Sequence, residues 1–168
     1  MRRRTLAQLV VRAAAAIAVM LGTWDAAVRA QPPRPKDTVD PAKADLSETV
    51  GLLSGLHLYQ TYLNIGMIAD CKTEGVYPEK DARTLLASIM TPLEKIDKQL
   101  EKVLKRMTEK DDREALDTVR KLVSVLREEG KQLQLYWETG KAEHSTKYEA
   151  ARKEAWAGIS KLLGIEEP

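Results

Sequence analysis

The side chains best suited to chemistry in this 168-residue chain are two histidines, one cysteine and two amides near the first histidine. His57, Gln60 and Asn64 are spaced three and four residues apart, so on a helix they share one polar stripe. Such a stripe beside a core predicts either a ligand site between helices or a hydrogen-bonded network that fixes the helix register. Buried polar groups usually satisfy one another, which favours the network and leaves the ligand site as the alternative.

Haem is the first cofactor to consider for a helical protein with so few ligating residues. Covalent attachment needs a Cys-x-x-Cys-His motif, and Cys71 is the only cysteine in the chain. A non-covalent haem would need His57 and a methionine on a facing helix, such as Met90. A methionine on a helical seam usually packs in a core, so the sequence predicts no cofactor.

Metal and enzyme motifs are missing from the sequence as well. A di-iron bundle needs Glu-x-x-His on two helices, but Ser54 and Lys141 occupy the positions three residues before His57 and His144. Two histidines and one cysteine supply no zinc-ligand spacing. There is no glycine-rich phosphate loop and no nucleophile elbow. We therefore expect no metal, no catalytic residues and a protein that is not an enzyme.

The first thirty residues have the order of a secretory signal. Arginines at positions 2–4 precede a short apolar run, Ala13 to Leu21, which is too short for a permanent membrane span. Val28-Arg29-Ala30 then places small residues where a signal peptidase cleaves. This order predicts a signal peptide over residues 1–30 and an exported protein, periplasmic or extracellular. The alternative is that these residues form an uncleaved amphipathic anchor.

Removal of residues 1–30 reverses the sign of the net charge. They hold five of the 27 basic side chains and one of the 25 acidic ones, so the remainder carries about two more acids than bases. Without a clustered basic face, nucleic-acid binding is not expected. Four of the seven prolines lie between residues 32 and 41, which predicts a flexible leader over residues 31–44. Cys71, as a lone thiol in an exported protein, is expected to be buried or inert, and the alternative is a disulfide between two chains.

The rest of the chain has the pattern of four amphipathic helices joined by short connections. They are predicted over Asp45–Asp70, Glu79–Met107, Asp112–Thr139 and Ala142–Leu163. The second has an unbroken heptad seam, which predicts one helix kinked at Pro92 rather than two separate helices. Gly140 and Gly164 are placed to end the third and the fourth. This pattern predicts an all-α fold, an up-down-up-down antiparallel four-helix bundle over residues 45–168.

The first of these helices is unusual because no residue from 49 to 69 is charged, in a chain that is 31% charged overall. Something must hide such a helix from water. One side carries large residues that we expect to enter the core, namely Leu52, Leu53, Leu56, Leu63 and Met67. The opposite side carries small and aromatic residues, namely Gly51, Gly55, Leu58, Tyr62, Gly66 and Ala69.

Small residues at this spacing let a second helix approach closely, so the glycine side predicts a homodimer interface. The alternative is that the leader or another bundle helix covers this side. A membrane span is disfavoured because His57, Gln60 and Asn64 are polar.

The segment from His57 to Gly66, together with Ala155-Trp156-Ala157-Gly158-Ile159, resembles a family of uncharacterised exported bacterial helical proteins. The resemblance implies no activity. The sequence as a whole predicts an exported, non-enzymatic helical bundle with a binding or structural role, self-associating through its first helix. Two alternatives stay open: a small-molecule or non-covalent haem carrier that uses the stripe at His57, and a periplasmic helical chaperone or stress adaptor.

Overall fold

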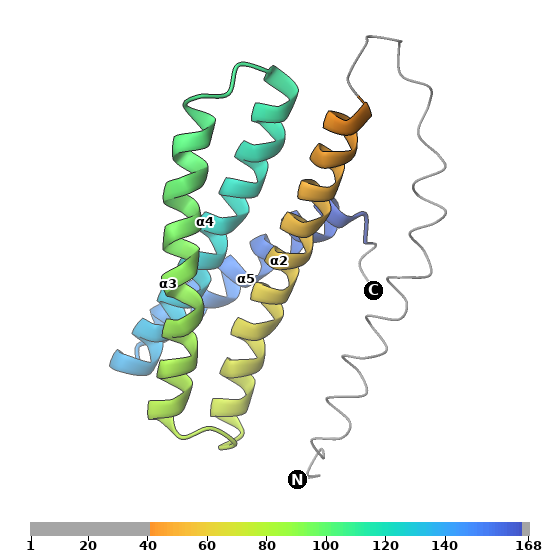
Figure 1. Ribbon diagram of the computed structural model, residues 1–168. Coiled ribbons are helices and arrows are strands. Elements are labelled where there is room, and N and C mark those ends of the chain that lie inside the picture. Colours follow the sequence, from red (N-terminus) through yellow and green to blue (C-terminus); the bar gives the residue numbers. More distant parts are fainter. Residues whose placement is uncertain (1–40, 166–168) are drawn as a thin grey trace. The chain divides into compact units, whose positions relative to one another are not determined.

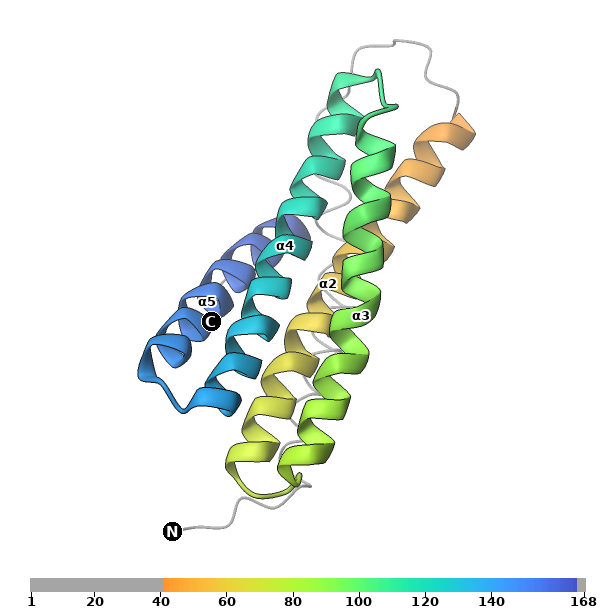
Figure 2. The same ribbon diagram turned by 90° about the vertical axis from the view of Figure 1, so that its left-hand side faces the viewer.

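The computed structural model describes residues 41–165, with side chains from residue 45 onward, and within that range every regular element is a helix (Figure 1). The helices are α2 (Pro41–Thr73), α3 (Glu79–Leu104), α4 (Lys110–Thr139) and α5 (Ala142–Leu163). Successive helices run in opposite directions, and α5 is inclined to the other three (Figure 2). The prediction of an all-α four-helix bundle is confirmed. The predicted signal peptide, and the leader up to residue 40, lie outside the described residues.

The helix bounds follow the prediction closely, and four ends differ, one of which is the C-terminal end of α2 at Thr73 instead of Asp70. Helix α2 begins at Pro41, so residues 41–44 are helical and do not belong to a flexible leader. Proline lacks the amide hydrogen that the first helical turn leaves unused, which makes it a suitable first residue. Helix α3 continues through Pro92 as predicted but stops at Leu104, and α4 starts at Lys110. Gly140 and Gly164 end α4 and α5 in the left-handed conformation, as predicted.

The core follows the apolar seams of α3, α4 and α5. Helix α5 approaches α4 closely at Gly158, where a Cβ would overlap the side chain of Leu122, and Ala151 and Ala155 of α5 are buried. Large side chains that are almost completely buried fill the space between the four helices; they are Leu58, Ile65, Leu86, Leu93, Val123, Leu126 and Ile159.

The prediction for the two sides of α2 is wrong. The side expected to enter the core is on the outside, with Leu52 39% exposed, Leu53 62%, Leu56 48%, Leu63 40% and Met67 47%. Gly55, Leu58, Gly66 and Ala69, from the glycine side, are buried instead. The physical reason is that large side chains of α5 need space where they cross α2, and only a strip of small residues provides it.

The N-terminal turns of α2 stand apart from the rest of the bundle. Every residue from Asp45 to Leu53 is exposed, and both views show this part of the helix diverging from α3 and α4 (Figures 1 and 2). A short helix exposed on all sides is only marginally stable in water. The segment therefore gains little stability from its own chain.

Candidate functional site

The outward side of α2 is an exposed apolar surface. Its residues recur at alternating steps of three and four, and we call them the outer stripe: Leu46, Thr49, Leu53, Leu56, Gln60, Leu63 and Met67. All seven are exposed, and none is charged. Helical side chains at this spacing form one continuous seam. A continuous apolar seam on a water-exposed surface is uncommon in a monomeric protein and usually marks an interaction site.

The glycine side of α2 is occupied by α5 of the same chain. A Cβ at Gly55 would come within 2.6 Å of Leu163 Cδ2, and one at Gly66 would overlap the guanidinium of Arg152. The ring of Trp156 on α5 lies 5.6 Å from that of Tyr62, between centroids. The structure therefore shows the alternative expectation, in which another helix of the bundle covers the glycine side.

Of the six residues predicted to form a dimer interface, Gly55, Leu58, Gly66 and Ala69 are buried within the bundle and Tyr62 is partly buried. Gly51 is exposed, with nothing near enough to contact an added Cβ. None of the five covered residues is free to meet a second copy while α5 stays in place.

The polar residues of α2 do not form the buried network that the sequence favoured, because His57, Gln60 and Asn64 are all exposed. His57 borders a groove of about 250 Å³ where α2 diverges from α3 and α4. The groove is lined mainly by apolar side chains, namely Val50, Leu53, Leu58, Ile96, Leu100, Val119 and Val123, together with Ser54. Gln60 and Asn64 are absent from this lining, so the structure does not bring the three predicted ligand residues into one site.

Sequence reasoning missed a buried ion pair at the junction of α2, α4 and α5. Glu129 of α4 is completely buried, and its Oε1 accepts a hydrogen bond of 3.2 Å from Arg152 Nη1 of α5. The guanidinium also lies over the ring of Tyr62, 4.5 Å from its centroid. The Arg152 guanidinium fits beside α2 because residue 66 is glycine and has no Cβ to occupy that space. The signal in the sequence was an acid, Glu129, lying between Leu126 and Leu133 on the seam of α4.

The electrostatics of this pair are dominated by burial. Loss of hydration raises the pKa of Glu129 to about 7, and the nearby Arg152 opposes that rise without cancelling it. Glu129 Oε2 is buried without a hydrogen-bond partner among the described residues. The folded state therefore holds the Glu129 proton more tightly than the unfolded state does, and this contribution to stability is lost as pH rises through about 7.

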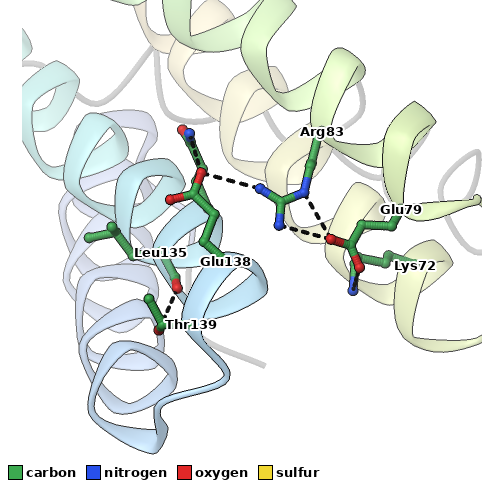
Figure 3. Close-up of polar contacts among 7 residues, drawn as sticks. Lys72, Glu79, Arg83, Leu135, Glu138 and Thr139 are labelled. Carbon is green, nitrogen blue, oxygen red and sulfur yellow. Dashed lines mark hydrogen bonds and ion pairs between the residues drawn. The ribbon is translucent and has the colours of Figure 1, made fainter.

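The end of the bundle opposite the projecting turns is linked by ion pairs. Arg83 of α3 contacts Glu79 at 2.8 Å and Glu138 of α4 at 3.2 Å, and Lys72 of α2 reaches Glu79 at 3.7 Å (Figure 3). Exposed pairs of this kind contribute about 0.2–1 kcal/mol each. They help to hold α2 at its C-terminal end, which leaves its N-terminal half as the accessible part.

No family model, curated protein or solved structure matches this chain. The resemblance to uncharacterised exported helical proteins therefore stays a prediction. Between residues 41 and 165 no helix is both long and apolar enough to cross a bilayer. In the same part of the chain no three acidic, histidine or cysteine side chains are grouped as metal ligands would be.

Cys71 is partly buried near the end of α2. Burial raises the pKa of its thiol, and the carboxylates of Glu74 and Asp70 raise it further. The reactive thiolate is therefore suppressed at neutral pH, which supports the expectation of an inert cysteine.

Proposed function

We propose that this is an exported, non-enzymatic helical-bundle protein with a binding or structural role, and that two copies associate through the outer stripe of α2. The observation that carries the proposal is the exposure of the stripe: Leu46 is 63% exposed and Leu53 62%, on a helix without charge between residues 49 and 69. Association would remove these side chains from water.

The size of the stripe sets the expected affinity. Covering a half-exposed leucine yields roughly 1 kcal/mol, so five large side chains from each copy supply on the order of 10 kcal/mol. Association itself costs about 4–15 kcal/mol, so only part of this gain remains as binding free energy. With the smallest of these costs about 6 kcal/mol remains, so we expect a weak dimer that forms between roughly tens of micromolar and millimolar concentration.

The test is the mass of the exported protein in solution, measured by light scattering over a range of concentrations. Leu56→Glu places a charge in the centre of the stripe and should convert the dimer to a monomer. Leu85→Glu is the matched control, because Leu85 is also an exposed leucine, 39% exposed, but lies on α3. A wild-type protein that stays monomeric at about millimolar concentration, the upper end of the expected range, contradicts the proposal.

The groove at His57 supports a second candidate, a carrier of a small apolar molecule. Its lining is apolar apart from His57 and Ser54, which is the composition of many small-molecule sites. An absorption spectrum tests for haem, and displacement of an environment-sensitive dye tests for other apolar ligands. Dye binding by a monomer that Leu100→Glu abolishes would favour the carrier over self-association. Dye binding by a monomer that Leu56→Glu abolishes would instead favour a chaperone surface.

A further inference from the structure

We propose that the two copies pair with their α2 helices antiparallel and in one register, so that Thr49 of each copy faces the partner's Gln60. This inference rests on the proposed self-association and adds the orientation and register of the interface. It follows from the order of residues along the outer stripe and from the projection of its N-terminal half.

The stripe forms a heptad seam with two polar positions, Thr49 and Gln60. The first, third, fifth and seventh stripe residues are at heptad position a, and the others are at position d. In an antiparallel pair of helices, each residue at position a faces a residue at position d of the partner. In one register, every stripe residue from 46 to 63 faces a residue of the same polarity, leucine against leucine and polar against polar. This register places Leu46 opposite the partner's Leu63, Thr49 opposite the partner's Gln60, and Leu53 opposite the partner's Leu56.

Charge disfavours two other arrangements. Asp70 follows Met67 at the next seam position, and Asp45 lies beside the seam at its start. A parallel pair would place Asp70 against the partner's Asp70. An antiparallel pair shifted by one heptad would place Leu46 against the partner's Asp70. Contact between like charges, or burial of an unpaired charge, raises the free energy of an arrangement and so disfavours it.

The shape of the bundle favours the same arrangement. Residues 45–53 of α2 project from the bundle, whereas residues 55–69 are packed on its body. In the antiparallel register each projecting segment lies along the packed half of the partner's α2. In a parallel pair the two projecting segments would meet only each other. The antiparallel arrangement also obeys a two-fold axis, so the interface closes after two copies.

Cysteine cross-linking tests the register. Thr49→Cys and Gln60→Cys leave every leucine of the stripe in place, and Cys71→Ser in all proteins removes the native thiol. The two positions are eleven residues apart, or about 16 Å along the helix. A disulfide requires Cα atoms within about 7 Å, so in the proposed register neither single variant should cross-link to itself. A mixture of the two variants should give at least about tenfold more covalent dimer than either alone.

Each other result contradicts a specific part of the proposal. Cross-linking of Thr49→Cys with itself would show a parallel pair. A non-covalent dimer in which the mixture does not cross-link would show a different register or surface, and self-association would still stand. Proteins that light scattering shows to be monomeric would remove the proposed function along with the register. Mixtures with Leu85→Cys on α3 measure the background from random collisions.

Discussion

At the scale of single residues, Glu129 is the feature with the largest consequence for stability. Its side chain is completely buried, one carboxylate oxygen has no partner among the described residues, and Arg152 supplies a single hydrogen bond to the other. Apolar side chains of similar volume in place of both Glu129 and Arg152 would be a stable alternative to such a pair. The pair instead couples three helices through Arg152, which touches Glu129 on α4 and Tyr62 on α2.

The raised pKa of Glu129 makes stability depend on pH. Because the pKa rises from 4.5 to about 7 on folding, the folded state holds this proton more tightly than the unfolded state. The stabilising effect is complete below pH 4.5 and is lost as pH rises to about 7. Glutamine stays neutral at every pH in this range. The free energy of unfolding of Glu129→Gln should therefore rise relative to that of the wild type as pH increases, by on the order of 2–3 kcal/mol at pH 8.

Urea unfolding at pH 5 and pH 8 measures this difference. Glu154→Gln, at an exposed position on α5, is the control and should follow the wild-type profile. Equal free energies of unfolding for wild type and Glu129→Gln at both pH values would show that the carboxyl group is not held in a water-free environment.

At the scale of elements, α2 shows how small residues choose a packing partner. Both sides of this helix are apolar, so neither side has a hydrophobic advantage large enough to determine which one is buried. The glycines at 55 and 66 create two gaps, and Leu163 and Arg152 of α5 occupy them. The bulky outer stripe has no comparable gaps, so it stays outside.

Two glycine substitutions on α2 should change stability in opposite directions. Gly66→Ala places a methyl group where the Arg152 guanidinium lies, so we expect a loss of about 1–3 kcal/mol. Gly51→Ala meets nothing within 4 Å at an exposed helical position, so we expect a gain of about 0.5–1 kcal/mol from helix propensity. Thermal unfolding followed by circular dichroism measures both. A neutral or stabilising Gly66→Ala would show that the Arg152 guanidinium can move away from α2 without a loss of stability.

At the scale of the whole molecule, the two ends of α2 differ. Its C-terminal end is linked to the described bundle by ion pairs, and its N-terminal end projects from it. Ion pairs among Lys72, Glu79, Arg83 and Glu138 connect α2, α3 and α4 at the first. At the other, α2 projects and borders an apolar groove. An unpaired apolar surface of this kind is a liability for a protein at high concentration unless another molecule covers it.

The proposed export fixes where that surface would act, and it can be tested on the full chain. Small residues at positions 28 and 30 predict cleavage after Ala30, so the exported protein should begin at Gln31. Ala30→Trp should block cleavage and leave a heavier precursor with the cell envelope, as seen by intact-mass measurement. An exported protein that retains residues 1–30 in the wild type would show that they act as an anchor.

The sequence by itself determined the elements. The spacing of leucines and valines in α3 and α4, the glycines at 140 and 164, and the short loops predicted four helices with bounds close to those observed. These signals are local, because a helix period and a C-terminal glycine act within a few residues of the chain.

Only the tertiary structure decided which side of α2 is buried and what the polar residues do. Periodicity gave no preference, because leucines on one side and glycines with tyrosines on the other are both apolar. The choice depends on shape complementarity with α5, about 90 residues further along the chain, and so do the burial of Glu129 and the exposure of His57, Gln60 and Asn64. Packing between distant segments is a property of three-dimensional fit, which the period of a single helix does not contain.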